Sequence, residues 1–250
     1  MDGRSRALRA VRLSSEGATH MTAPKRGRPR RGPDPERFHE IVDAAAQIFH
    51  RKGYSATSIQ DIAEAVGVLK GSLYHYVKSK EDFLYAIIDG ATQVALQEIQ
   101  AVARMEAGPV DKLTAFVGTH VRFATSHLTA YSIRLREMRE LGQERREKIQ
   151  ADGAAYNKVM RDVLVQGQEQ GVFDAGMDVD LMTTIALGQM NALTRWYRED
   201  GPYTPEQLAD VFARTVVSAV ISDRGLQGEG VEGLRRSIRA APRADVAAQA

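Results

Sequence analysis

The sequence has no cysteine, which excludes a disulfide framework, a thiolate metal site and a cysteine nucleophile. No stretch approaches the roughly 18 unbroken apolar residues that a membrane-spanning helix needs. A P-loop, a dinucleotide fingerprint, GxSxG and HExxH are also missing. His120 and His127 share a helix face but have no clear third ligand, which argues against a metal site. We therefore expect a cytoplasmic protein that is not an enzyme and uses no cofactor or metal.

The charge is unevenly spread along an otherwise ordinary globular composition. The 250 residues are 43% hydrophobic and 26% charged, with a net charge of only +2. Residues 1–90 hold 15 Lys and Arg against 11 Asp and Glu, so the remaining residues carry a slight acidic excess. Because phosphate contacts dominate the affinity of most DNA-binding proteins, this asymmetry favours a nucleic-acid partner for the first third of the chain.

Residues 1–33 are rich in Arg, Gly, Ser and Pro and have little apolar periodicity, which predicts a disordered basic arm. Its segment PKRGRPRR, residues 24–31, resembles an AT-hook, which lies in the minor groove of A·T-rich DNA. Arg28 and Arg30 would enter that groove, where the negative potential is concentrated. A solubilising basic tail explains the same residues equally well, and translation from Met21 would retain them.

Residues 59–78, IQDIAEAVGVLKGSLYHYVK, have the spacing of a helix-turn-helix. Ala63 is small where two helices must cross, and Gly67 can adopt the positive φ that ends the first of them. Leu73 and Tyr76 turn one face of the second helix inward. The opposite, polar face is free for a partner, although a plain helical hairpin would leave it only solvated.

Apolar periodicity predicts an all-α protein, and no segment alternates as a strand. A first helix ends at Gly53, a second is capped by Thr57 or Ser58, and a long fourth helix runs from Ser79 to about Met105. Further helices are predicted near residues 109–127, 129–141, 144–170, 178–199 and 205–222. The predicted divisions are a basic arm at 1–33, a head at 34–80, a body at 81–224 and a flexible tail at 225–250.

The head contains a composite motif of about 50 residues: GYSATSI at 53–59, DIA at 61–63, GV at 67–68, GSLYH at 71–75 and SKE at 79–81. With this motif the sequence resembles the TetR family of bacterial transcriptional regulators. The resemblance implies a three-helix DNA-binding head and a helical ligand-binding and dimerisation body. It also implies a homodimer that releases its operator when a small molecule binds.

The resemblance assigns DNA contacts to the head. Thr57 and Tyr74 would give hydroxyls to phosphates and Lys80 would add a charge, while other polar side chains would reach base edges in the major groove. The predicted DNA-binding residues are Arg28, Arg30, Thr57, Ser58, Lys70, Gly71, Ser72, Tyr74, His75 and Lys80. Two positions depart from the family pattern, because Leu69 replaces a residue able to cap the recognition helix and Val77 replaces a phenylalanine.

In the body, GVF at 171–173, DVD at 178–180, RWY at 195–197, GP at 201–202 and TPE at 204–206 resemble the branch that controls fatty-acid and steroid degradation and senses acyl-CoA thioesters. Aromatic and methionine side chains at helical spacing are usually plain core, but here they could also converge on a cavity. The candidate ligand-binding residues are Phe116, His120, Phe123, Tyr131, Arg134, Met138, Tyr156, Met160, Met190 and Trp196. A buried Arg134 would need an anion, either a ligand phosphate or a neighbouring glutamate such as Glu137.

One recognition helix contacts too few base pairs to specify a unique DNA site. We therefore expect a homodimer on a palindromic operator, with the two recognition helices about 34 Å apart. The candidate dimer interface is an apolar stripe on the last predicted helix, formed by Leu208, Val211, Phe212, Thr215, Val216 and Ala219. Leu181, Ile185 and Leu193 could face it, although the stripe could instead cover the chain's own core.

Two functions fit these features. The first is a dimeric repressor that a small molecule, such as an acyl-CoA thioester, releases from double-stranded DNA. The alternative is an architectural protein that coats A·T-rich DNA without a ligand. Specificity separates them, because a repressor should prefer its operator by roughly a thousandfold or more.

Overall fold

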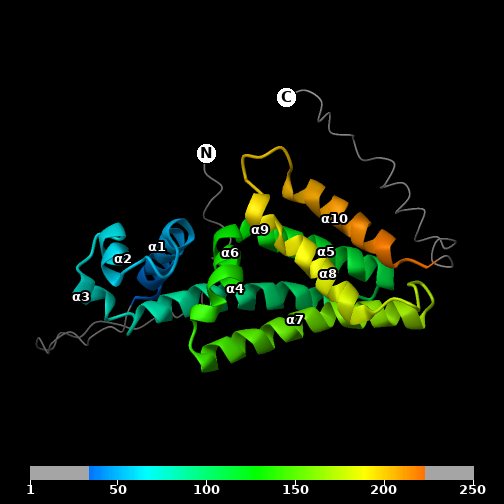
Figure 1. The fold of residues 1–250 in the computed structure, drawn as a ribbon, viewed down its shortest axis with the longest axis horizontal. Helices are drawn as coiled ribbons and strands as arrows, with labels where there is room; N and C mark the ends of the chain where they lie inside the picture. The colour runs from blue at the N-terminus through cyan, green and yellow to red at the C-terminus, as the bar shows by residue number, and fades with distance from the viewer. Residues whose placement is uncertain (1–33, 223–250) are drawn as a thin grey trace, which may run out of the picture. The chain divides into compact units, whose positions relative to one another are not determined.

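The computed structural model describes residues 34–222, and this range is all-α as predicted (Figure 1). Within it, the sole strand-like pairing is an isolated bridge between Phe173 and Ile221. The predicted basic arm, with Arg28 and Arg30, and the predicted tail lie outside the described residues. The helices are α1 (Pro35–Lys52), α2 (Ile59–Ala65), α3 (Lys70–Leu73), α4 (Lys80–Ala103), α5 (Pro109–Ser126), α6 (Leu128–Glu137), η1 (Met138–Glu140), α7 (Gln143–Glu169), α8 (Val179–Asn191), α9 (Leu193–Trp196) and α10 (Pro205–Val220).

The head helices begin and end where the local sequence predicts. Gly53 ends α1 with a φ of 84°, and Gly67 follows α2 with a φ of 69°, a region that favours glycine. Ser58 caps α2, because its hydroxyl accepts from the Asp61 amide while the Asp61 carboxylate accepts from the Ser58 amide. The Ser58 backbone and hydroxyl, with help from Lys52, lower the pKa of Asp61 to about 2.

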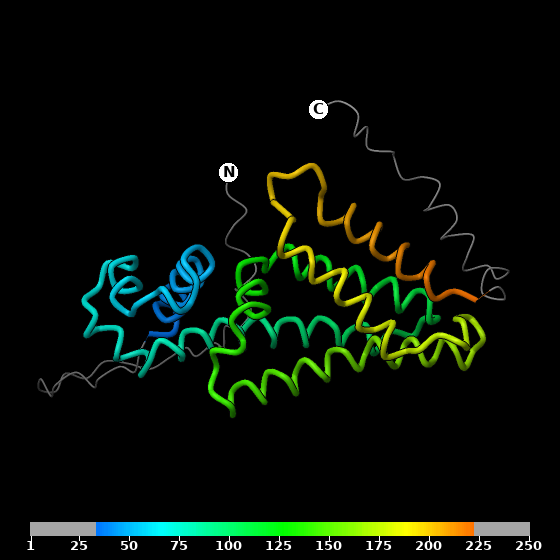
Figure 2. Tube along the Cα trace, viewed as in Figure 1, coloured from blue at the N-terminus to red at the C-terminus, as the bar shows by residue number. Residues whose placement is uncertain are grey.

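The core of the head extends into α4. Buried side chains of α1, α2 and α3, among them Phe49, Ile62 and Leu73, belong to the same cluster as Phe83 and Ile87 of α4. Further along, α4 contributes Ile99 and Val102 to the core of the body, and its trace continues from the head into the body (Figure 2). One helix therefore takes part in both cores, and the domain boundary placed at residue 80 stays a prediction.

In the body, α5 packs against α4, α7 and α10, and α10 follows α5 along its length (Figure 1). The predicted helix at 178–199 is wrong in one respect, because the chain breaks near Ala192 into α8 and α9. The Ala192 amide is shared between the carbonyls of Gly188 and Gln189, both at 3.2 Å, and the helix tightens there. With no glycine or proline at the break, periodicity gives no sign of it.

Arg145 at the start of α7 clamps the amino end of α4. Its guanidinium bonds to the Asp82 carboxylate, lies 3.3 Å from Glu81 and covers the Tyr85 ring. Burial alone would raise the pKa of Asp82, but hydrogen bonds from Arg145 and from two backbone amides lower it below its usual value. Within residues 34–222, every helix is too short or too polar to cross a membrane.

Candidate functional site

The face of α3 opposite the core is open to solvent. Leu73 is fully buried, whereas Lys70 and Gly71 of α3 and Tyr74 and His75 in the turn directly after it are exposed. Ser72, also predicted to bind DNA, is half-buried. Because a short polar helix held by one buried leucine can project its other side chains into a groove, this face is the candidate DNA-reading surface.

The two departures from the family pattern have visible consequences. Leu69 precedes α3, provides no side-chain cap, and has an exposed fraction of 81%. The Ser72 amide instead bonds to the Leu69 carbonyl at 2.8 Å, and α3 is only four residues long. Val77 is buried in the head core, where it has a smaller side chain than the phenylalanine of the family pattern.

Thr57 and Lys80 differ from their predicted roles as free phosphate contacts. The Thr57 hydroxyl is buried and donates its hydrogen to the Gly53 carbonyl at 2.7 Å. The Lys80 ammonium donates to the carbonyls of Tyr54 and Thr57, at 2.8 and 2.7 Å, and lies 4.2 Å from the centre of the Tyr54 ring. Lys80 thus ties the first residue of α4 to the loop that precedes α2, because that loop offers two carbonyls without helical partners.

The body contains a cavity of about 360 Å³ among α4, α5, α6, α7 and α8. Half of the ten predicted ligand-binding residues line it: His120, Phe123, Tyr131, Arg134 and Tyr156. Sequence reasoning missed the rest of the lining: Ala91, Thr92, Ala95, Leu96, Gly153, Asn157, Thr183, Thr184, Leu187, Gly188 and Asn191. These are mostly small or neutral residues, which carry little chemical signal until the helices are packed.

The other five predicted ligand-binding residues lie elsewhere. Phe116, Met160 and Met190 are buried in the body core, as aromatic and methionine side chains commonly are. Met138 packs against the core shared by the head and α4, because the 3-10 helix η1 turns it away from the cavity. Trp196 is 47% exposed, because α9 ends there and leaves its side chain outside the core.

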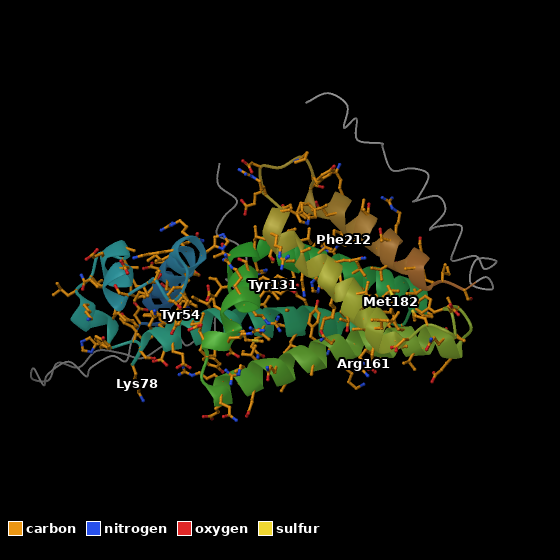
Figure 3. The ribbon with its side chains drawn as sticks, in the orientation of Figure 1. Tyr54, Lys78, Tyr131, Arg161, Met182 and Phe212 are labelled. Atoms are coloured by element: carbon orange, nitrogen blue, oxygen red, sulfur yellow. The ribbon has the colours of Figure 1, made fainter. Side chains whose placement is uncertain are left out.

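A chain of hydrogen bonds crosses the cavity wall. Tyr131, on α6 (Figure 3), donates its hydroxyl hydrogen to the Asn191 side-chain oxygen. The Nε2 atom of His120, 3.3 Å from the Tyr131 oxygen, must then be the donor in that pair. The Nδ1 atom of His120 therefore accepts from the Tyr156 hydroxyl at 3.0 Å. Hydrogen bonds are thus donated from Tyr156 to His120, from His120 to Tyr131 and from Tyr131 to Asn191, and we call this series the relay.

Electrostatics agree with a neutral His120. Its complete burial, assisted by the positive charge of Arg134, lowers the pKa of His120 to about 4. Burial also raises the pKa of Tyr131 to about 12 and that of Tyr156 well above 10. The relay is therefore uncharged at neutral pH, with one proton on the imidazole. Among residues 34–222, no cluster of three or more His, Asp or Glu residues could hold a metal ion.

The predicted dimer stripe divides between two faces of α10. Leu208 and Val216 are buried in the chain's own core, so our assignment of these two residues to a dimer surface is wrong. Val211, Thr215 and Ala219 are exposed, and Phe212, which Figure 3 labels on α10, is half-buried. The physical reason is the packing of α10 along α5, which takes one side of the helix and leaves the other. On α8, Leu181 and Ile185 are also exposed, whereas Leu193 on α9 is buried in the body core, so its predicted place beside the stripe is wrong.

An exposed polar recognition helix in the head, joined by a shared helix to a body that contains a cavity, is typical of transcriptional regulators that carry the DNA-reading and ligand-binding parts in the same polypeptide. The comparisons with known proteins agree. Residues 41–87 match the bacterial regulatory proteins of the tetR family, and residues 106–220 match the tetracyclin repressor-like C-terminal domain. The chain belongs to the TetR family.

Several relatives are similar along most of their length. The HTH-type transcriptional repressor KstR2 of Mycobacterium tuberculosis is 28% identical over 74% of this chain and 92% of its own. The structure of PfmR from Thermus thermophilus is 32% identical, with a TM-score of 0.67 over 71% of this chain and 97% of that one. AibR, solved with isovaleryl coenzyme A and operator DNA, is 28% identical, with a TM-score of 0.65 over 72% and 97%.

Proposed function

We propose that this protein is a homodimeric repressor, acting in the cytoplasm, that leaves a palindromic operator when a CoA thioester or related acyl compound enters the body cavity. One observation carries the proposal: α6 lines the cavity and also packs against α1 of the head. A ligand that displaces α6 would therefore displace the head. The name of KstR2 as a repressor and the isovaleryl coenzyme A in the AibR structure support the same function.

The contacts of α6 supply a direct route between the two sites. Tyr131 and Arg134 line the cavity, whereas Ser132 on the adjoining face lies 3.0 Å from Nδ1 of His50 in α1. Arg136 lies 3.2 Å from the same His50 nitrogen. A small rotation of α6 would break these contacts, and ligand binding would favour the rotated state if the cavity fits it better.

The exposed apolar side chains of α8 and α10 support a dimer. Leu181, Ile185 and Val211 have exposed fractions of 57%, 45% and 49%, which is costly for a surface that stays in water. The double substitution Ile185→Asp and Val211→Asp should convert the dimer to monomers and abolish operator binding. Light scattering measures the mass, and an unchanged dimer would place the interface elsewhere.

The test of the function is to select operator DNA from random sequence with the full chain. The complex is then challenged with isovaleryl-CoA, octanoyl-CoA and CoA alone. We expect a palindromic site, bound roughly a thousandfold more tightly than random DNA, and release by a thioester but not by CoA. Equal binding to many A·T-rich sequences would favour the architectural alternative, and a complex indifferent to every thioester would contradict ligand control by this class.

The recognition face gives a second test. His75→Ala should alter which base is preferred at one operator position, because an exposed imidazole can reach base edges. Tyr74→Phe should weaken operator and random DNA alike, since loss of a hydroxyl to phosphate carries no sequence information. If His75→Ala lowers both affinities equally, the assigned roles are wrong.

A further inference from the structure

Arg134 is the single charged residue among those that line the body cavity. Its guanidinium lies against α7 at Gly153, where a Cβ would come within 3.0 Å of Nη2. Among the described residues Arg134 forms no hydrogen bond or ion pair, and Glu137 does not pair with it. A half-buried cation without a counterion beside an apolar cavity gains most from an anionic ligand.

Among the remaining polar groups of the wall, the threonine hydroxyls have already donated their hydrogens, whereas the side-chain amides of Asn157 and Asn191 still carry N–H donors. The hydroxyls of Thr92, Thr183 and Thr184 each donate to a carbonyl one turn earlier in their own helix. Asn191 differs, because its side-chain oxygen accepts from Tyr131 and thereby fixes the amide orientation. The His120 imidazole also hydrogen-bonds the Asn191 side chain in the sense that raises the His120 pKa, which assigns that contact to the Asn191 oxygen too and leaves the two NH₂ hydrogens to be donated.

We infer that the cavity recognises an acyl compound through two oxygen sites, an oxyanion bound by Arg134 and a second acceptor oxygen bound by the Asn191 amide. This rests on the proposed function only in using the same cavity. The Tyr156, His120 and Tyr131 relay acts as a positioning device, because it holds the Asn191 oxygen and so points the amide hydrogens toward the ligand. The lining around these groups, including Leu96, Phe123 and Leu187, takes the hydrocarbon part.

The oxyanion has two possible sources, a carboxylate on the acyl compound or a phosphate of CoA. Calorimetry without DNA distinguishes them with four probes: octanoate, octanoyl-CoA, CoA and neutral 1-octanol. We expect octanoate or octanoyl-CoA to bind at least about tenfold more tightly than 1-octanol, as a charge-assisted hydrogen bond implies. Arg134→Gln should remove that advantage and Arg134→Lys should retain most of it. If Arg134→Gln loses affinity for octanoate alone, the oxyanion is the carboxylate. If it loses affinity for octanoyl-CoA or CoA, the oxyanion is a phosphate.

Asn191→Leu tests the second site, because it removes the NH₂ donors without adding a charge beside Arg134. It should weaken the bound anion by about tenfold. Arg161→Gln is the matched control, since Arg161 lies on α7 outside the cavity and pairs with Asp180 at 2.7 Å (Figure 3). It should leave every affinity unchanged.

The inference is overturned if Arg134→Gln binds both anions as tightly as the unsubstituted protein, if 1-octanol binds equally well, or if neither anion binds. Should Arg134→Gln not fold, sodium chloride provides the alternative test. The affinity for the bound anion, but not for 1-octanol, should then fall as salt rises. Operator release is measured separately, so anion binding without release would contradict the proposed function and leave this inference standing.

Discussion

Replacing Lys80 with methionine tests whether this lysine holds the head to α4 or contacts DNA. The ammonium donates two hydrogen bonds to the carbonyls of Tyr54 and Thr57 and lies over the Tyr54 ring. A hydrogen bond from a charged donor contributes about 1.5–3 kcal/mol when sheltered, and Lys80 is only half-buried. After a discount for solvent screening, we expect the free energy of unfolding to fall by about 2 kcal/mol.

Urea unfolding followed by circular dichroism measures this change, at one fixed protein concentration because dimerisation adds to stability. Lys78→Met is the matched control, since Lys78 is exposed and its described contact is the backbone amide that donates to Asp82 (Figure 3). It should leave stability within about 0.5 kcal/mol of the unsubstituted protein. If Lys80→Met unfolds at the same urea concentration but binds all DNA more weakly, Lys80 is a phosphate contact and our reasoning is wrong.

Two further predictions concern the body. Burial holds the pKa of His120 at about 4, below 6.5 in the unfolded chain, so stability is lost as pH falls. Between pH 7 and 5.5 the free energy of unfolding should drop by about 1 kcal/mol more in the unsubstituted protein than in His120→Gln. Equal slopes in urea titrations of the two proteins would refute this. A Cβ at Gly167 would lie 1.9 Å from Phe173, so Gly167→Ala should destabilise by about 2 kcal/mol, whereas Gly90→Ala, with open space in α4, should gain up to about 1 kcal/mol. A neutral Gly167→Ala would show that the Phe173 ring moves at little cost.

Local sequence signals were sufficient to predict the helical elements of the head. Gly53 and Gly67 mark helix ends because their backbone φ is positive, and Ser58 with Asp61 marks a start because each side chain satisfies the other's amide. These signals act over four or five residues and need no other part of the chain. The all-α fold and the membership in the TetR family follow from the same kind of pattern, confirmed by the matches to both halves.

The cavity lining and the contacts between helices could be identified only from the tertiary structure. Periodicity indicates that Phe116, Met160 and Tyr156 face inward, but it cannot separate Tyr156, which lines the cavity, from the two that fill the core. Tyr131 and Asn191 are 60 residues apart and meet only when α6 packs near α8. Likewise, the partners of Lys80 are backbone carbonyls, which every residue has, so the sequence cannot indicate which ones it will contact.

The sequence by itself determined the all-α fold, the caps and glycine ends of the head helices, and the family, because these depend on side chains close along the chain. Tertiary packing decided which inward residues enclose space, which face of α10 remains exposed, and that Arg134 lacks a counterion among the described residues. Those properties depend on the distances between helices, and a periodic pattern fixes only the direction of each side chain about its own helix axis.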